Sequence, residues 1–305
     1  MSISHPSRTP RANRVLVIHN PMAGRGHSRL FQDVTAALER LGCDVAIQTT
    51  TQRGDAEAFA RSADPETFDV AVAAGGDGVI AEVVNGLLAN DVGDHDLPLG
   101  IIPLGTANVL AMEIALPADA YSLARIIAAG PRRCCYPGLA NGRAFMMMAG
   151  AGFDAHVVNN VSSSLKKRIG KGAYVWAALC ELMRRNRNRF DVVTGGRTIS
   201  AASVIVSKGR YYGGHYICTP DSRLDRPTFQ VCLFERSGTW ATLRYLLGLV
   251  RGAIPRMQGV TLIETDALRI EGRHGDPVQG DGDIIANLPL DVRVAERGLL
   301  VLAPD

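Results

Sequence analysis

The sequence has little of what marks several common protein classes. Aromatic residues make up only 6% of the 305 residues, and 33 basic against 30 acidic side chains leave a net charge of only +3. A charge balance this even gives no support for a nucleic-acid partner, and we expect none. Hydrophobic residues reach 47%, an ordinary globular share that excludes wholesale disorder.

Metal-binding cysteine pairs and long apolar runs are also missing. None of the six cysteines forms a Cys-x-x-Cys pair, and residues 1–13 lack the apolar stretch of a secretory signal. The most apolar segment, 97–114, is interrupted by two prolines and two glycines, so we expect no continuous membrane-spanning helix there. These absences favour reduced thiols and a cytoplasmic protein.

Glycine is abundant, with 32 residues, and the first 130 positions show a regular alternation of strands and helices. Expected strands are 14–19, 44–49, 69–74 and 99–102, and expected helices are 30–41, 56–63, 80–88, 108–114 and 118–129. Strands that alternate with helices in this way predict a parallel sheet with covering helices.

The pattern changes after Gly130-Pro131. Strand-like segments follow at 144–149, 190–193, 199–206, 229–234, 267–270 and 291–295, with helical intervals at 172–185 and 239–254. We therefore predict an α/β domain over residues 1–130 and a second, mostly antiparallel β domain over 131–295. The last apolar run lies within residues 296–305 and can pack with either domain, so the chain can end back on the first domain.

The strongest local signal is Gly75-Gly76-Asp77-Gly78, between a buried strand and a helix. Ligands bind at this position in open α/β sheets, and glycines next to free helix N–H groups suit a phosphate. Asp77 fits a cation or a reacting hydroxyl beside that phosphate. The alternative is a plain turn in which Asp77 caps the helix. The neighbouring loops favour the phosphate site.

Two further loops have the same design. Residues 102–108 contain Gly105 and follow another strand, and residues 20–26 contain Arg25 and follow the first strand. Because glycine-bearing loops end three parallel strands, we predict one nucleotide-binding crevice. The chain has neither a Walker P-loop nor the Gly-x-Gly-x-x-Gly of dinucleotide-binding proteins, which disfavours a P-loop NTPase and a Rossmann dehydrogenase.

A series of motifs follows along the chain, at 19–21 with 24–26, 75–78, 103–108, 150–155, 211–214, 219–221 and 280–283. Together they resemble the diacylglycerol kinase catalytic-domain family, which includes bacterial lipid kinases, sphingosine kinases and ceramide kinases. The resemblance covers nearly the whole chain in the family's order. It implies a phosphofructokinase-like three-layer N-terminal domain that binds ATP and a C-terminal β-sandwich that receives the lipid.

The resemblance also implies roles for single residues. Expected ATP contacts are Asn20, Thr50, Gly75, Gly76, Asp77, Gly78, Val79, Ile80, Ala81, Gly105 and Thr106. The family's proton acceptor lies in an Asp-Gly-Glu signature that reads Asp281-Gly282-Asp283 here. Asp283 is therefore the expected base, with Asp281 and Asp77 supporting it or holding Mg²⁺. The alternative is that residues 281–283 form only a hairpin turn, and the family match favours the catalytic role.

Several positions depart from the family's pattern. Val79 replaces a threonine, Val109 replaces an acidic residue, and Asp283 replaces a glutamate, which shortens the reach by about 1.5 Å. Arg226-Pro227 stands where bacterial members have the Asp-Gly of a structural cation site. We expect that second site to be absent or moved to Asp225.

A lipid substrate requires access to a bilayer, and two kinds of feature would suit one. Basic residues cluster at 166–171 and 184–189, and a stripe at helical spacing comprises Trp240, Leu243, Leu247, Val250 and Ile254, with Arg244 and Arg251 alongside. The alternative is solvated basic faces and a helix packed on the sandwich, and for the helix this alternative is slightly favoured. A peripheral position at the inner membrane face is one expectation, and a homodimer is left open.

The sequence therefore predicts an ATP- and Mg²⁺-dependent lipid kinase that phosphorylates the hydroxyl of a diacylglycerol-like or sphingoid lipid. One alternative is a catalytically impaired paralogue that binds lipid or nucleotide as a regulator, which the departures from the family pattern would explain. A less favoured alternative is an NAD kinase-type enzyme, which shares Gly-Gly-Asp-Gly but does not explain the motifs at 20–26 and 211–214.

Overall fold

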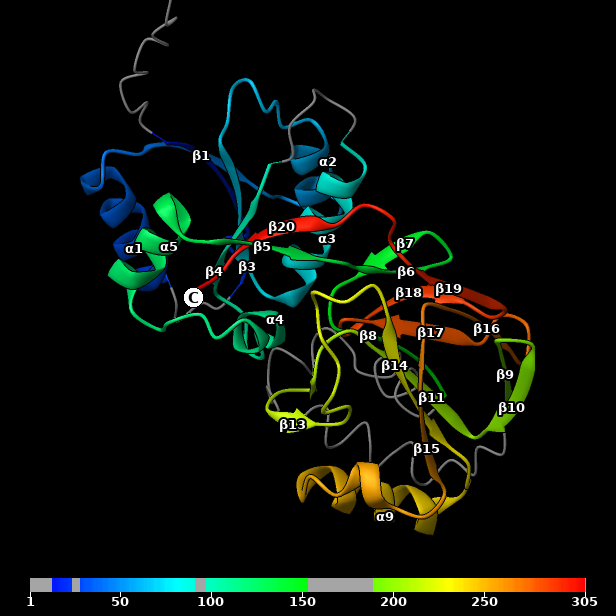
Figure 1. Cartoon of the computed structure of the whole chain (residues 1–305). Coiled ribbons are helices and arrows are strands. Elements are labelled where there is room, and N and C mark those ends of the chain that lie inside the picture. The colour runs from blue at the N-terminus through cyan, green and yellow to red at the C-terminus, as the bar shows by residue number, and fades with distance from the viewer. Residues whose placement is uncertain (1–12, 24–27, 91–96, 153–188, 305) are drawn as a thin grey trace, which may run out of the picture.

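The structure is a computed structural model that describes residues 13–23, 28–90, 97–152 and 189–304. Its first part is built on a six-stranded sheet in the order β2-β1-β3-β4-β20-β5 (Figure 1). The strands are β1 (Arg14–His19), β2 (Asp44–Thr49), β3 (Val70–Gly75), β4 (Leu99–Pro103), β5 (Arg132–Cys135) and β20 (Leu299–Leu302). All neighbours are parallel except β20 and β5.

Helices cover both faces of this sheet and make it the middle of three layers (Figure 1). They are α1 (Ser28–Arg40) and α5 (Ala120–Ala129) on one face, and α2 (Asp55–Arg61) and α3 (Asp77–Leu88) on the other. Because side chains alternate along a strand, Val15 and Val17 of β1 pack with α1 and α5. Leu16 and Ile18 pack with α2 and α3.

The second part contains two antiparallel sheets of six strands each, in the orders β10-β9-β16-β19-β6-β7 and β15-β14-β11-β8-β17-β18. The first comprises β6 (Gly138–Ala140), β7 (Arg143–Phe145), β9 (Phe190–Thr194), β10 (Arg197–Ala201), β16 (Ala267–Glu271) and β19 (Leu290–Val294). The second comprises β8 (Met148–Ala151), β11 (Ser203–Ser207), β14 (Phe229–Phe234), β15 (Val260–Thr265), β17 (Pro277–Gly280) and β18 (Asp283–Asn287).

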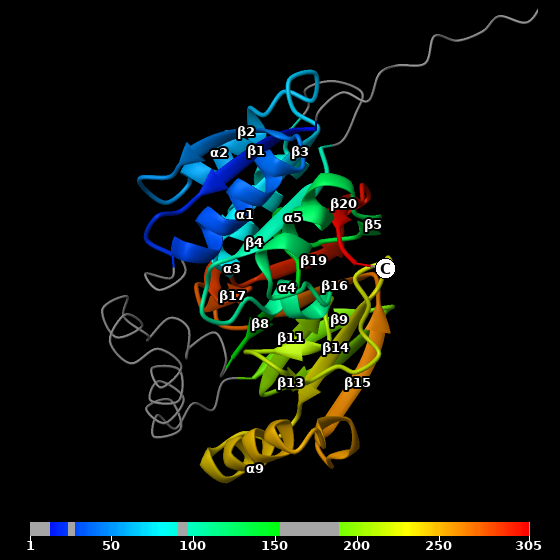
Figure 2. The same ribbon diagram turned by 90° about the vertical axis from the view of Figure 1, so that its left-hand side faces the viewer.

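A single apolar cluster joins the two antiparallel sheets into a sandwich. It includes Phe145, Phe190 and Phe229, each about 1% exposed, together with aliphatic residues from both sheets. The three-layer α/β part lies above the sandwich in Figure 2. The fold class predicted from the sequence is confirmed.

A few short elements complete the described chain. They are α4 (Val109–Glu113), α9 (Thr239–Val250), the 3₁₀ turn η1 (Ile254–Arg256), β12 (Tyr211–Tyr212) and β13 (Tyr216–Ile217). Within the described residues, no helix is both long and apolar enough to cross a membrane. The helix expected at 172–185 and the basic cluster at 166–171 lie outside the described residues. So does the cluster at 184–189 except for Arg189, which donates hydrogen bonds to Ser200.

The division of the chain into domains remains a proposal. The β5 and β20 strands pair with each other antiparallel, and β20 also pairs with β4 of the parallel sheet. We therefore propose that the first domain extends beyond residue 130 to include β5, and that it takes back the last strand of the chain.

Candidate active site

Main-chain hydrogen bonds bring the ends of the parallel strands together. The Asn20 N–H donates to the Ala74 carbonyl at 3.0 Å, and the Thr50 N–H donates to the His19 carbonyl at 2.8 Å. In the same way the Leu104 N–H donates to the Gly75 carbonyl at 2.9 Å. Three stretches predicted to contact nucleotide, around Asn20, Thr50 and Gly75, therefore line one edge of the sheet. Residues 24–27, which include the expected Arg25, lie outside the described residues.

Two of the glycine loops touch backbone to backbone. A Cβ placed on Gly105 would lie 2.5 Å from the Cα of Gly76 and 2.6 Å from Oδ1 of Asn108. Neither Gly76 nor Gly105 has a left-handed φ, so the requirement here is close approach rather than conformational freedom. Gly76, the N-cap of α3, makes no side-chain cap hydrogen bond. The Val79 N–H already donates to the Gly76 carbonyl at 3.0 Å, so an anion at this helix start would meet the N–H groups of Asp77 and Gly78.

Asp77 ties these two loops together. Its carboxylate accepts the N–H of Asn108 at 3.0 Å and the N–H of Val109 at 2.8 Å. It therefore caps α4 rather than its own helix. Asn108 in turn accepts the Gly105 N–H through Oδ1 at 2.8 Å, and its own φ is +49°. Burial raises the pKa of Asp77, and main-chain N–H groups, first those of Val109 and Asn108, oppose that rise.

Asp281 is the most deeply held of the acids. Its Oδ1 accepts the N–H groups of Met147 and Met148, both at 2.9 Å, and its Oδ2 accepts that of Met146 at 2.7 Å. Burial raises the pKa of Asp281 to about 6, the three N–H donors lower it, and the charge of Asp77 adds a smaller rise. Asp281 therefore holds the β7–β8 connection and lies close enough to Asp77 for their charges to interact.

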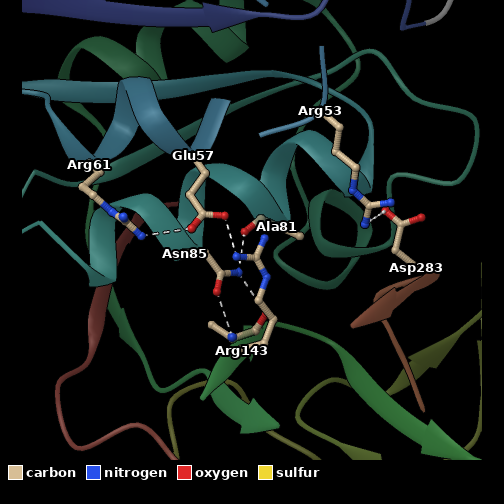
Figure 3. A network of polar contacts seen from close by, with 8 residues as sticks. Arg53, Glu57, Arg61, Ala81, Asn85, Arg143 and Asp283 are labelled. Carbon is tan, nitrogen blue, oxygen red and sulfur yellow. Dashed lines mark hydrogen bonds and ion pairs between the residues drawn. The ribbon is translucent and has the colours of Figure 1, made fainter. Parts of the chain in front are cut away.

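Asp283 begins β18 in the second part of the molecule, yet it lies beside the start of α3 in the first. A Cβ on Gly78 would be 3.2 Å from Oδ2 of Asp283. The same oxygen is 3.9 Å from a guanidinium nitrogen of Arg53, and the Asp283 side chain is 43% exposed (Figure 3). Asp283 lines a cleft of ≈ 230 Å³ together with Arg53, Gly78, Ala81, Glu82, Asn85, Arg143, Ala144, Gly280, Ile284 and Ile285.

The remaining residues predicted to bind ATP differ in whether their side chains or only their backbone groups can contact a ligand. Ile80 is 2% exposed and Val79 is 9% exposed, so both side chains belong to the core. A Cβ on Gly75 would collide with the Val79 side chain, which lies directly beneath that loop. Only the backbone of these residues can meet a ligand. Thr106, by contrast, is exposed at the tip of its loop, and Ala81 lines the cleft.

Asp225 has neighbours that do not suit a cation. Its two carboxylate oxygens accept hydrogen bonds from Arg223 at 3.0 and 2.9 Å. The ammonium of Lys208, which interacts with Asp225, donates to the carbonyls of Arg226 and Thr228, and burial lowers the pKa of Lys208 to about 8. With two basic side chains already present, this donor set does not fit Mg²⁺. Across the described residues, no three acidic, histidine or cysteine side chains are grouped to hold a metal.

Sequence reasoning missed the residues that join the two parts of the molecule beside the cleft. Asn85 of α3 accepts the Ala144 N–H at 2.9 Å and donates to the Ala144 carbonyl at 3.1 Å. Arg143 forms an ion pair with Glu57 of α2 (Figure 3). These partners are far apart in the sequence and form no motif, so no local signal identifies them.

Both parts of the chain match families of known proteins. Residues 14–135 match the family described as the diacylglycerol kinase catalytic domain. Residues 147–303 match the YegS C-terminal NAD kinase beta sandwich-like domain. Diacylglycerol kinase of Bacillus subtilis (strain 168) is 27% identical over 295 residues, which are 95% of this chain and 96% of the relative. Diacylglycerol kinase of Staphylococcus aureus (strain bovine RF122 / ET3-1) is 28% identical over 296 residues, 96% of this chain and 93% of the relative.

Solved structures support the fold. A crystal structure of a diacylglycerol kinase from Bacillus anthracis str. Sterne superposes with a TM-score of 0.74 at 20% identity, covering 97% of this chain and 98% of that one. Yeast NADH kinase complexed with NADH superposes with a TM-score of 0.51 at 13% identity, covering 97% and 85%. Residues 14–135 are therefore a diacylglycerol kinase catalytic domain, and through residues 147–303 the chain belongs to the YegS C-terminal NAD kinase beta sandwich-like family. It is a lipid kinase, a phosphotransferase whose acceptor is an alcohol group.

Proposed function

We propose that this lipid kinase transfers the γ-phosphate of ATP to the hydroxyl of a diacylglycerol-like or sphingoid lipid, and that Asp283 accepts the hydroxyl proton. The observation that supports this most directly is the position of the Asp283 carboxylate against Gly78, at the start of α3. A phosphate held at that helix start would place its attacking hydroxyl next to this base.

In the proposed nucleotide half of the site, main-chain groups make most of the contacts with ATP. We propose that residues 75–81 and the loop containing Gly105 and Thr106 hold the phosphates, with Asn20 and Thr50 beside them at the sheet edge. Phosphates bind well to closely approaching N–H groups at a helix start. The close approach of Gly76 to Gly105 supports this proposal, because it makes one continuous surface of two loops.

Mg²⁺ fits Asp77, at the start of α3, better than it fits Asp225. Mg²⁺ in kinases is usually held by one or two carboxylates together with the substrate phosphates, rather than by a complete protein cage. Asp77 is the carboxylate that would hold it here, because its two N–H partners leave lone pairs on both oxygens, while Asp283 stays free to act as the base. When bound with ATP, the ion would neutralise charge on the phosphates. Arg53, 3.9 Å from Asp283, adds a further positive charge on the same side of the cleft.

The test is phosphate transfer from labelled ATP, with Mg²⁺, to a panel of diacylglycerol, ceramide, sphingosine and NAD. We expect label in a lipid and none in NAD. Asp283→Asn should lower kcat by about 10²- to 10⁴-fold, the usual range for a general base, while the Kd for ATP stays near that of the wild type. Asp291→Asn is the matched control, because that carboxylate lies on β19, is paired with Arg269 of β16, and is outside the residues that line the cleft.

Other outcomes would contradict the proposal in distinct ways. An Asp283→Asn enzyme with unchanged kcat would exclude Asp283 as the base. Bound ATP without transfer to any acceptor would favour the regulatory paralogue. Label in NAD alone would favour an NAD kinase-type enzyme, whose fold is shared with yeast NADH kinase.

A further inference from the structure

The outward face of α9 is apolar, although the rest of the described chain leaves it uncovered. Trp240 is 84% exposed and Val250 is 64% exposed, and Leu243 and Leu247 are 40% and 46% exposed. At 3.6 residues per turn these four side chains fall on one side of the helix. A surface helix normally turns such a stripe toward the core, so this exposure requires an explanation.

The opposite side of α9 is already anchored, which fixes the outward orientation. The Tyr245 hydroxyl donates to the Gly259 carbonyl at 2.8 Å, and its ring packs edge-on against Phe234. Gly248 lies so close to Met257 that it leaves no room for a Cβ. The apolar stripe therefore cannot turn inward without breaking this packing. The helix lies at the end of the sandwich away from the parallel sheet (Figure 1).

The charged residues of α9 and of the turns that follow it are all basic. Residues 236–263 contain four arginines, Arg236, Arg244, Arg251 and Arg256, and no acidic residue. Arg244 and Arg251 lie beside the apolar stripe, are both exposed, and form no ion pair with any described residue. An apolar stripe bordered by unpaired arginines complements a surface that is apolar inside and anionic at its rim.

We propose that the α9 surface, formed by Trp240, Leu243, Arg244, Leu247, Val250 and Arg251, docks this enzyme on a bilayer that contains anionic phospholipid. At twelve residues, or about 18 Å, α9 is too short to span a bilayer, so it lies in the plane of the headgroups. An exposed tryptophan at the start of the helix suits that depth. The proposal rests on the proposed lipid-kinase function, because it names the surface through which the substrate's membrane is reached.

The experiment compares vesicle binding by the full-length protein and three double variants. Trp240→Ser/Leu247→Ser removes apolar area, and Arg244→Ala/Arg251→Ala removes charge. Tyr121→Ser/Arg125→Ala is the matched control, because it removes an exposed aromatic residue and an exposed arginine from α5. Each protein is sedimented with vesicles of phosphatidylcholine alone or with phosphatidylglycerol added, at rising salt.

We expect binding only to the anionic vesicles, weakened by salt. Two arginines near a charged surface contribute about 1 kcal/mol each, so Arg244→Ala/Arg251→Ala should bind about thirtyfold more weakly. Trp240→Ser/Leu247→Ser should also lose binding, and the α5 control should behave as the wild type. The chain has two tryptophans, so in a Trp176→Phe protein the tryptophan fluorescence comes from Trp240 alone. Its emission maximum should shift to shorter wavelength when anionic vesicles are added.

Three results would overturn the proposal. They are binding that ignores anionic lipid, α9 variants that bind like the wild type, and a dimer in sedimentation velocity that Trp240→Ser/Leu247→Ser dissociates. The last would mean that a second copy of the chain covers the stripe.

Kinase assays separate this inference from the proposed function. The α9 variants should phosphorylate a short-chain diacylglycerol in solution like the wild type and lose activity only on vesicles. A wild-type protein that binds anionic vesicles but phosphorylates no lipid would instead refute the proposed function and leave the docking surface standing.

Discussion

Three aspartates converge on the start of α3, and their hydrogen bonds distinguish them. Asp281 accepts three main-chain N–H groups and Asp77 accepts two. The Asp283 carboxylate accepts none from the described backbone and faces the cleft beside Arg53. A carboxylate with free lone pairs can accept a substrate proton, whereas one that holds loops in place acts mainly on geometry. We infer that Asp283 is the reactive acid, that Asp281 and Asp77 position the loops around it, and that Asp77 keeps lone pairs for Mg²⁺.

Asp77→Ala tests the positioning role. Without the carboxylate, the N–H groups of Asn108 and Val109 lose their acceptor, and the loss of a cap costs about 1–2 kcal/mol. We also expect the Kd for ATP to rise by about tenfold, since the Gly105 loop is no longer tied to α3. Urea unfolding and ATP titration measure the two effects. Asp119→Ala is the control, because Asp119 caps α5 through the Ser122 N–H, away from this site.

The two variants should separate stability from binding. Both should lose similar unfolding free energy, but only Asp77→Ala should lose ATP affinity. Equal ATP affinity in both would show that the tie between the loops is not needed for nucleotide binding.

The sequence could identify these acids but not their surroundings. Asp281-Gly282-Asp283 was recognisable as a family signature, and the structure brings it to Gly78 as the proposed chemistry requires. Which of the two acids faces the cleft depends on Asp281 having a φ of +49° and on N–H groups more than 130 residues earlier in the chain. Neither the φ of Asp281 nor its N–H partners can be predicted from residues 281–283 alone.

At the scale of elements, the parallel sheet was the most predictable part. β1, β3 and β4 are short apolar runs buried on both faces, and β2 is a mostly exposed edge strand. Each of the four is followed by a helix, which made the alternation easy to recognise. The strands β15, β17 and β18 were not predicted, although a hairpin turn at 281–283 was weighed as an alternative, and the structure has such a turn between β17 and β18. The residues of β15 are half-buried or exposed, and those of β18 are mostly half-buried, so neither shows a clear apolar alternation. The expected strand at 144–149 is divided into β7 and β8 by a turn whose N–H groups bind Asp281.

Gly105→Ala tests whether the two glycine loops must touch. The added methyl group would lie 2.5 Å from Gly76 and 2.6 Å from Asn108, so the loops must separate. Overpacking of this kind costs about 1–3 kcal/mol, and we expect ATP affinity to fall by about tenfold or more. Gly196→Ala, in the β9–β10 turn, is the control. Its φ is +74° with open space around it, so it should lose about 1 kcal/mol by backbone strain without a change in ATP affinity.

At the scale of the whole molecule, the site exists only because two distant halves of the chain meet. Asp283 belongs to the sandwich and Gly78 to the α/β part, and Asn85 holds the two parts together through Ala144. The sequence predicted both halves but not their interface, because the contacts join single residues rather than patterned segments. The last strand illustrates the same limit. Four apolar residues, 299–302, suit either part, and only pairing with β4 and β5 places them.

Asn85→Ala tests the interface. The variant leaves the buried N–H and C=O of Ala144 without their partner, which costs roughly 2–4 kcal/mol. Arg143→Ala removes a partly exposed ion pair one residue away, with Glu57, and should cost less than about 1 kcal/mol.

In Asn85→Ala we expect kcat to fall more than ATP affinity. The ATP loops all belong to the parallel sheet and its helices, whereas the proposed base reaches them only across the interface. Stopped-flow binding of a fluorescent ATP analogue and steady-state phosphorylation of a lipid measure the two quantities. Equal losses of kcat and ATP affinity would mean that Asn85 supports the nucleotide loops directly rather than the alignment of Asp283 with α3.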